Sequence, residues 1–387
     1  MDTDPLPLLA SLVRCPSVTP DQAGALDCLV AYLSAAGFQC ERLVFSETGT
    51  PDVDNLFARF GKGSPHMCFA GHIDVVPPGR LEDWAAPPFS AHQEDGFLFG
   101  RGTADMKGSV AAFAIAAADA VREGISVGSL SLLITADEEG PAINGTRKVL
   151  AWMKEQGHVP DHCLVGEPTS TEKLGDTIKI GRRGSLSFAV SITGIQGHVA
   201  YPHKADNPIP KLSRLVDRLA SHKFDDGNDR FDPTTLAFTT IDVGNPATNV
   251  IPARARACFN IRYNNEQTAE SLIALVNGIC RSVEGELGGS FVLDIAPRAD
   301  AFITEPGAFV GVVLDAIEAE TGVMAKLSTS GGTSDARFIK DYCPVLEFGP
   351  LNSTIHQVDE KIAIADLRNL AAIYRTIIET YLERAAA

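Results

Sequence analysis

Ionisable side chains come directly after three short apolar segments of the sequence. The apolar segments are Met67–Ala70, Leu130–Thr135 and Cys163–Val165, and each is typical of a buried strand. The side chains that follow them are His72 and Asp74, then Asp137, Glu138 and Glu139, then Glu167. Ligands of open α/β sheets bind outside the carboxyl ends of the strands, so we expect a binding site at this edge.

The pattern His72-Ile-Asp74 can serve a metal ion. The alternation of a strand places both side chains on the same face of the chain. The histidine can then bind a metal while the carboxylate behind it orients the ring and raises its basicity. Without other ligands, the same pattern also describes a structural histidine.

The three adjacent acids Asp137-Glu138-Glu139 can be a solvated turn or part of a catalytic site. Adjacent acids repel one another and are usually solvated on a plain surface. Directly behind a buried strand they can divide the work, because one glutamate can bind a cation while the other holds a water as general base. Their position after Leu130–Thr135 favours this second interpretation.

Two further candidate ligands lie outside these strand ends. Asp105 lies in a glycine-rich loop that opens an Ala-rich helix predicted over Gly108–Glu123, where it could instead be an N-cap. His356 lies far away in the sequence. Two histidines with several carboxylates suit zinc, manganese or cobalt, and a bridging carboxylate would suit a two-metal site.

The sequence contains no motif for a nucleophilic serine or cysteine or for nucleotide binding. There is no Gly-x-Ser-x-Gly motif, and the eight cysteines are scattered singly without a Cys-x-x-Cys pair. Neither of the phosphate-binding glycine patterns of nucleotide folds occurs. We therefore expect reduced core thiols and no nucleophilic serine or cysteine.

Length and composition indicate a globular protein of several domains. The 387 residues are 45% hydrophobic and 21% charged, which suggests two or three domains. The net charge of −16 has the wrong sign for binding nucleic acid, and no apolar run approaches the roughly 18 residues of a membrane span. The first residues have neither a basic stretch nor an apolar core, so we expect no secretory signal and a cytoplasmic location.

The order of the predicted elements indicates an α/β fold with an inserted α+β domain. The first half alternates strands with helices, including one over Thr146–Gln156, and this alternation predicts a mostly parallel sheet. The order then changes to β-α-β-β-α-β, the ferredoxin-like pattern. Its elements are predicted at Leu186–Thr193, Ile209–His222, Thr235–Val243, Ala255–Tyr263, Ala269–Val283 and Ser290–Ala296.

The chain returns to α/β character after this insertion. A helix near Phe309–Glu320, a strand near Pro344–Phe348 and a helix from Ile364 to Arg384 are predicted. We therefore expect a discontinuous catalytic domain of residues 1–182 and 296–387, with residues 183–295 as the inserted domain.

Several motifs together resemble the clan of zinc aminoacylases and carboxypeptidases. They are Ala70–Gly79, Gly100–Gly108, Thr135–Gly145 and Gly166–Thr169. Further stretches are similar to the succinyl-diaminopimelate desuccinylase family within that clan, namely Leu174–Asp176, Gly181–Ser185, Gln196–His203, Gly331–Asp335 and Glu347–His356. The resemblance covers nearly the whole chain.

The resemblance implies two zinc ions per subunit, for which cobalt or manganese can substitute. Five ligands are implied: His72 and Glu167 for one zinc, Glu139 and His356 for the other, and Asp105 as the bridge. Asp74 would orient His72, and Glu138 would be the general base.

The resemblance also implies a homodimer that is formed by the inserted domain, which would serve as a lid. His198 of this domain would donate a hydrogen bond to the scissile carbonyl across the dimer interface. The implied substrate-binding residues are Arg182, Ser185, Asn249, Arg262, Thr333 and Asn352. An arginine suits a succinate carboxylate, which it can hold with two hydrogen bonds. The alternative is that His198 is an ordinary loop residue and Arg182 a surface charge.

The implied activity is hydrolysis of N-succinyl-L,L-2,6-diaminopimelate, a small molecule, to succinate and L,L-2,6-diaminopimelate for lysine biosynthesis. Two alternatives stay open: a related deacylase, such as one for acetylornithine, and a non-catalytic binding protein of the same fold. The chain departs from the family pattern at Ile73, Thr103, Thr248 and Ala336. Only Thr248 lies near the expected substrate contacts, and it leaves the acyl specificity open.

Overall fold

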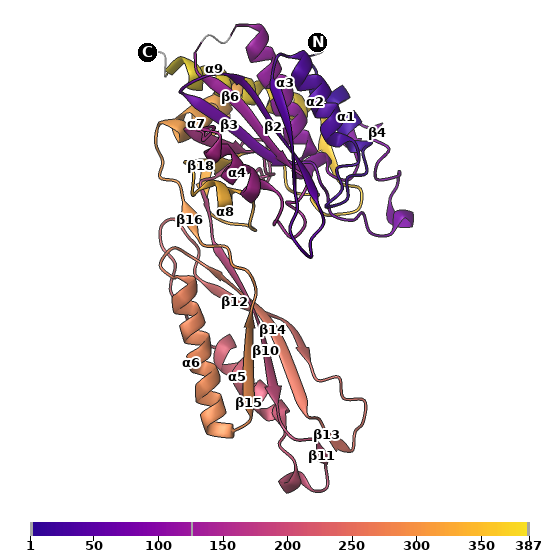
Figure 1. Cartoon of the computed structure of the whole chain (residues 1–387), viewed down its shortest axis with the longest axis vertical. Coiled ribbons are helices and arrows are strands. Elements are labelled where there is room, and N and C mark those ends of the chain that lie inside the picture. The colour runs from indigo at the N-terminus through magenta and orange to yellow at the C-terminus, as the bar shows by residue number, and fades with distance from the viewer. Residues whose placement is uncertain (1–2, 125–126, 385–387) are drawn as a thin grey trace. The chain divides into compact units, whose positions relative to one another are not determined.

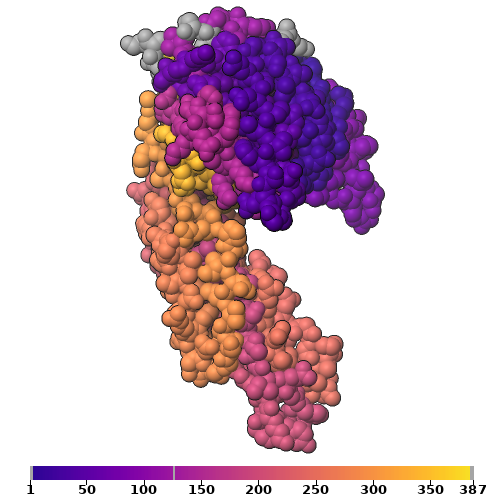
Figure 2. Space-filling model, viewed as in Figure 1, coloured from indigo at the N-terminus to yellow at the C-terminus, as the bar shows by residue number. Residues whose placement is uncertain are grey.

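The computed structural model describes residues 3–124 and 127–384, and the chain divides into two compact units. Unit 1 comprises Met1–Ile180, Thr304–Ser328 and Ser334–Ala387, and unit 2 comprises Gly181–Ile303 and Thr329–Thr333. Figure 2 shows indigo N-terminal and yellow C-terminal segments together in unit 1. The first and last parts of the chain therefore fold as one body.

An eight-stranded sheet forms the centre of unit 1, with the strand order β1-β2-β6-β3-β7-β18-β8-β17. Figure 1 labels β2, β6, β3 and β18 of this sheet. Its strands are β1 (Gln39–Phe45), β2 (Val53–Gly61), β3 (His66–His72), β6 (Ser129–Thr135), β7 (His162–Val165), β8 (Thr177–Lys179), β17 (Lys326–Ser328) and β18 (Val345–Glu347). β6, β3, β7 and β18 are parallel, whereas β1, β2 and β8 each have an antiparallel neighbour. The predicted α/β class with a mostly parallel central sheet is confirmed.

Helices cover this sheet, and its central strands are therefore buried. All residues of β3 and β6 are buried, as is typical of parallel strands in α/β folds. The helices are α1 (Pro5–Val13), α2 (Ala25–Ala35), α3 (Gly108–Arg122), α4 (Thr146–Glu155), α7 (Ala308–Thr321), α8 (Ala336–Ile339) and α9 (Ile364–Arg384). The Ala-rich α3 is buried nearly all round, and it packs on both β3 and α9.

Short elements complete unit 1. A three-stranded sheet contains β4 (His92–Glu94), β5 (Phe97–Phe99) and β19 (Lys361–Ala363), with β5 in the middle. A 3₁₀ turn, η1, spans Leu81–Asp83, and a π-type turn, η2, spans Thr103–Lys107 and leads into α3. The small sheet thus joins the segment before η2 to the segment before α9, although the two are far apart in the sequence.

Unit 2 has the predicted ferredoxin-like order of elements. They are β10 (Gly184–Thr193), α5 (Pro208–Ala220), β12 (Thr235–Asp242), β14 (Arg254–Tyr263), α6 (Ala269–Leu287) and β15 (Ser290–Ile295). The strand order is β12-β14-β10-β15, and all pairs are antiparallel. Buried and less buried residues alternate along β10 and β14, so one face of the sheet forms a core with α5 and α6.

Two short ribbons lie beyond opposite ends of β10 in unit 2. β9 (Gly181–Arg182) pairs with β16 (Phe302–Ile303) just before β10 begins, and β11 (Gly197–His198) pairs with β13 (Val250–Ile251) after it ends. Figure 1 shows the β16 and β11 labels at the two ends of the unit. A 3₁₀ turn, η3 (Pro202–Lys204), follows β11.

Some elements were not predicted or have different ends. Six elements of unit 1 were not among those predicted from the sequence: α1, α2, β1, β2, β8 and β17. α6 continues past Val283 to Leu287 because the first left-handed glycine, Gly288 with φ 67°, comes only then. Among the described residues, none of the helices combines the length and apolarity that crossing a membrane requires.

Candidate metal centre

Three neighbouring parallel strands end at the same edge of the sheet in unit 1. β6, β3 and β7 are adjacent, and His72 at the end of β3 lies opposite Thr135 at the end of β6. Glu138 and Glu139 follow β6, and Glu167 follows β7. Because the strands are parallel, these side chains lie beside His72 at one edge, as the sequence predicted.

Asp105 reaches this edge from the irregular turn η2, not as the N-cap of α3, a position that Lys107 occupies. Met106 packs on the strand ends at two glycines that leave room for it. A Cβ on Gly71 would lie 2.5 Å from Met106 Cε, and one on Gly166 would lie 2.8 Å from it. Glycine at these positions therefore allows η2 to lie close to the strands.

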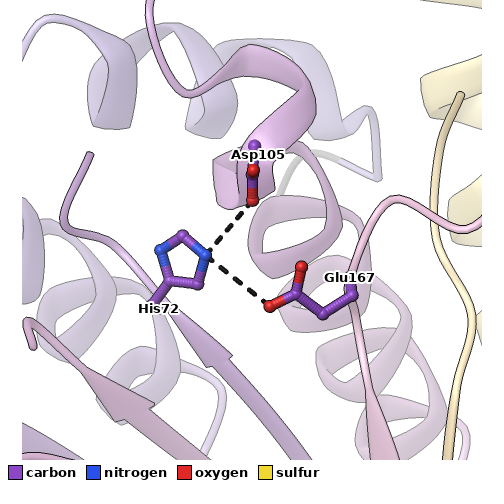
Figure 3. A group of neighbouring side chains, drawn as sticks. All are labelled: His72, Asp105 and Glu167. Carbon is purple, nitrogen blue, oxygen red and sulfur yellow. Dashed lines mark ion pairs between the residues drawn. The ribbon is translucent and has the colours of Figure 1, made fainter. Parts of the chain in front are cut away.

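His72, Asp105 and Glu167 form the first candidate ligand group (Figure 3). His72 Nε2 lies 3.3 Å from Asp105 Oδ1 and 3.9 Å from Glu167 Oε1. Both carboxylates point toward the same ring nitrogen. The His72 side chain is 1% exposed, so this group lies deep in unit 1.

Asp105, Glu139 and His356 form the second group. His356 Nε2 lies 2.8 Å from Glu139 Oε1 and 3.3 Å from Asp105 Oδ2. The His356 side chain is 49% exposed, so this group is nearer to solvent than the first. Asp105 belongs to both groups and presents one oxygen to each histidine, which is the arrangement of a bridging carboxylate.

The donor atoms of this cluster fit two divalent cations. The two histidine nitrogens and three carboxylates of the two groups are the mixed donors that zinc, cobalt and manganese accept. Asp105 Oδ1 is buried and accepts no hydrogen bond of good geometry, although His72 Nε2 lies near it. A buried oxygen with lone pairs to spare is what a bridging ligand requires.

The converging carboxylates change the pKa values of both histidines. Burial lowers the pKa of His72, but the neighbouring carboxylates, with Asp105 foremost, raise it well above its ordinary value. Hydrogen bonds to Asp105 and Glu139 raise the pKa of His356 to about 10. Positive charge is thus strongly favoured here, as expected for a site that neutralises its carboxylates with cations.

Asp74 contacts its neighbours differently from the expected pattern. His72 Nδ1 donates to the Asp74 backbone carbonyl oxygen at 2.8 Å, while the nearest carboxylate oxygen lies 3.7 Å away. The carboxylate instead accepts the backbone N–H groups of Glu138 at 3.3 Å and Glu139 at 3.1 Å. Asp74 therefore orients His72 through its main chain and holds the two glutamates through its side chain.

The acidic turn after β6 is buried at Asp137 and held by hydrogen bonds, so it is not a solvated surface turn. Asp137 is 2% exposed, and its carboxylate accepts three backbone N–H groups of the loop that follows. Burial, followed by the charges of Glu167 and Asp335, raises the pKa of Glu138 well above its ordinary value. A carboxyl group in such surroundings can take up a proton and release it, as a general base and acid must.

The sequence profile described as "Peptidase family M20/M25/M40" matches residues 68–380. The chain belongs to peptidase family M20/M25/M40. The matched range contains both candidate ligand groups of this M20/M25/M40 member.

Curated relatives of this M20/M25/M40 member match it over nearly their full length. The succinyl-diaminopimelate desuccinylase of Rhodospirillum centenum is 55% identical over 382 residues, which are 98% of each chain. The succinyl-diaminopimelate desuccinylase of Parvibaculum lavamentivorans is 53% identical over 378 residues, which are 98% of this chain and 95% of the relative.

Solved structures of the same fold cover nearly the whole chain. Aminopeptidase PepT from Bacillus cereus has a TM-score of 0.80 at 21% identity and covers 98% of this chain and 99% of its own. A dinuclear metal binding peptidase of the M20 family from Bacillus subtilis has a TM-score of 0.73 at 15% identity, with 98% of each chain covered. At these identities the likeness concerns the fold alone.

Four predicted substrate-binding residues of the M20/M25/M40 member lie at one end of unit 2. Ser185 and Arg262 are paired across β10 and β14. Arg182 Nη1 donates to the Gly332 carbonyl oxygen at 3.1 Å, and Thr333 is the next residue in the chain. Arg262 Nη1 is buried without a hydrogen-bond partner in the described part of the chain, so it could hold an anionic group.

His198 and Asn249 lie at the opposite end of unit 2. They are brought together by the β11–β13 ribbon, where Val199 N donates to the Asn249 carbonyl oxygen at 3.1 Å. β10, ten residues long, separates this ribbon from Ser185 and spans about 30 Å. Within one unit, His198 and Asn249 are therefore not near the other substrate-binding candidates.

The remaining candidate, Asn352, lies in unit 1, where its N–H donates to the Ser170 carbonyl oxygen at 3.0 Å.

Two further residues beside the candidate metal centre were not predicted from the sequence. Arg101 and Glu360 are buried and form an ion pair of 2.7 Å next to η2. The available signals were that Arg101 lies in the Gly100–Gly108 motif beside Asp105 and that Glu360 follows His356 closely in the sequence.

We predict that Asp105→Ala abolishes the binding of both cations, because Asp105 takes part in both ligand groups. The measurement is zinc per chain after chelation, reloading and removal of free metal. The chelated protein should keep its circular dichroism spectrum, since the ligands stand on a preformed α/β sheet.

Asp119→Ala, which removes an aspartate in α3 that pairs with Arg122, is the matched control and should still bind two zinc ions. Retention of either zinc by Asp105→Ala would contradict the bridging assignment.

Proposed function

We propose that the protein hydrolyses N-succinyl-L,L-2,6-diaminopimelate to succinate and L,L-2,6-diaminopimelate, a step of diaminopimelate and lysine biosynthesis in the cytoplasm. The observation that carries the proposal is the shared carboxylate of Asp105 between two histidine-containing ligand groups. It occurs in a chain that is 55% identical over 98% of its length to a succinyl-diaminopimelate desuccinylase.

Two zinc ions per subunit are proposed as the cofactor, with cobalt or manganese able to replace them. His72 and Glu167 would hold one ion, Glu139 and His356 the other, and Asp105 would contact both. When bound, such ions polarise an amide carbonyl and lower the pKa of water.

Glu138 is proposed as the general base. It takes a proton from the attacking water and passes it to the leaving amine of diaminopimelate. Asp74 fixes the position of Glu138, because its carboxylate accepts the Glu138 N–H. Glu139, held by the same carboxylate, remains available as a ligand.

The arginines of unit 2 are proposed to bind substrate carboxylates. Arg262 lies beside Ser185 in the sheet, and its buried Nη1 lacks a partner among the described residues. A guanidinium fork can hold a carboxylate by two charge-assisted hydrogen bonds. We assign Arg182, Arg262 and Ser185, with Thr333, Asn249 and Asn352, to recognition of the succinylated substrate.

His198 is proposed to donate a hydrogen bond to the scissile carbonyl oxygen of the partner subunit's substrate. Its Nδ1 accepts the Ala200 N–H at 3.0 Å, so the neutral ring carries its proton on Nε2, where it can donate. Ser185 and Arg262 lie about 30 Å away in the same unit, so one small substrate cannot reach both ends of it. A homodimer formed through the inserted domain, residues 183–295, would bring the two ends of different copies to one substrate.

The proposed reaction is tested by steady-state kinetics. The zinc-loaded protein is given succinyl-diaminopimelate as substrate, and acetylornithine and formyl-amino acids are assayed in parallel. We expect the succinylated substrate to have the highest kcat/KM, because its succinyl group carries a carboxylate that an arginine can hold with two hydrogen bonds, whereas acetyl and formyl groups carry none. A preference for an acetylated substrate would instead identify a related deacylase, and no turnover of any substrate would indicate a binding protein.

We predict that Glu138→Gln keeps both zinc ions but lowers kcat by about 10²–10⁴-fold, because glutamine is isosteric but cannot accept the proton. Zinc content and kcat are measured on the same preparation. Glu139→Gln is the paired variant and should lose zinc. The reverse outcome would mean that the two neighbouring glutamates have exchanged roles.

We predict that His198→Ala lowers kcat by about 10²–10³-fold with the fold and the zinc content unchanged. A mixed dimer of one His198→Ala subunit and one Glu138→Gln subunit tests whether the histidine acts on the partner. Action in trans leaves one site intact, so about half the wild-type activity should return. Activity near background in the mixed dimer would refute the shared site.

A further inference from the structure

The carboxylate of Glu360 accepts four hydrogen bonds from the segment that ends at Asp105. Oε1 accepts the N–H groups of Ala104 at 2.9 Å and Asp105 at 3.1 Å. Oε2 accepts the N–H of Gly102 at 3.0 Å and Nη1 of Arg101 at 2.7 Å. Glu360 is 0% exposed, so water cannot replace these contacts. Its side chain therefore determines where the backbone of the shared ligand lies.

The main chain of Glu360 joins the same two segments. Its carbonyl oxygen accepts the Gly100 N–H at 2.8 Å, and β19, which starts at Lys361, pairs antiparallel with β5. The segment that carries His356 is thus tied to the segment that carries Asp105, first by strand pairing and then by the Glu360 carboxylate.

Arg101 extends this connection to the histidine ligand itself. Its Nη1 donates to the Gln357 carbonyl oxygen at 3.1 Å and its Nη2 to the His356 carbonyl oxygen at 3.4 Å. His356 has a left-handed backbone with φ 60°, a conformation that is unfavourable for a non-glycine residue. Surrounding contacts must hold such a residue in place, and Arg101 supplies one to His356 itself and one to the residue that follows it.

We propose that Glu360 is a positioning residue of the metal centre, which together with Arg101 sets Asp105 and His356 at the separation that a cation between them requires. Glu360 touches neither substrate nor cation and acts only through these two ligands. The inference rests on the two-cation centre of the proposed function and is independent of the substrate.

The two cations should depend on Glu360 to different degrees. The His72 side chain is 1% exposed and stands on β3, whereas the His356 side chain is 49% exposed and stands on the turn that Arg101 holds. The cation of the Asp105, Glu139 and His356 group should therefore weaken more than the cation of the His72 group when Glu360 is changed.

The experiment measures the two zinc affinities of Glu360→Gln and Glu360→Asp by competition with a chelator. The Gln variant presents an NH₂ group to two of the present donors, and the Asp variant keeps the charge beside Arg101 but is one methylene too short. We expect the affinity of the His356-containing site to fall by about 10–100-fold, that of the other site to fall less, and kcat to fall at limiting zinc. Removing one partner of a buried ion pair can unfold a protein, so the charge-retaining Asp variant keeps the test open.

The matched control is Asp225→Asn in unit 2. The Asp225 carboxylate also accepts several hydrogen bonds, from the N–H groups of Gly227 and Thr234 and the amides of Asn264 and Gln267, but far in the chain from any ligand. It should lower the melting temperature and leave both zinc affinities unchanged. Wild-type zinc affinities in a folded Glu360→Asp or Glu360→Gln protein would overturn the inference, whereas a wild-type protein that binds no zinc would overturn the metal centre itself.

Discussion

The candidate metal centre of unit 1 depends on one carboxylate, Asp105, that faces two histidines from distant parts of the chain. His72 ends a central strand and His356 stands on a turn before the last helix, and their Nε2 atoms each lie 3.3 Å from a different Asp105 oxygen. No local interaction can set this geometry. The parallel order β6-β3-β7 places the strand ends together, and the small β5–β19 sheet brings the distant turn to them.

A cluster of this kind must also overcome the repulsion among its own acids. The chain achieves this by turning backbone N–H groups toward the carboxylates that lie outside the two candidate ligand groups. Asp74 accepts two such groups, Asp137 three, and Glu360 three together with Arg101. These acids are stabilised by dipoles already in place, so the carboxylates of the two candidate ligand groups remain available to a cation.

The sheet of unit 2 differs from that of unit 1, because the described helices pack on only one of its faces. The alternating burial of β10 and β14 gives a core with α5 and α6, and the other face carries Ser185, Asn260 and Arg262. Its length separates two groups of functional candidates, with Arg182 and Arg262 at one end and His198 and Asn249 at the other. This separation along one continuous sheet is the physical basis for proposing that a site is completed by two copies.

The sequence by itself determined the α/β and ferredoxin-like elements, because periodicity and turn residues are local properties. It also determined that the acids and the histidine after the three strands lie at one edge of the sheet. Only the tertiary structure decided that the Asp74 carboxylate holds Glu138 and Glu139 while its carbonyl orients His72, since both contacts depend on how the chain bends after β3. It alone also revealed Glu360 and Arg101. Their importance comes from contacts across more than 250 residues of chain, which no spacing in the sequence records.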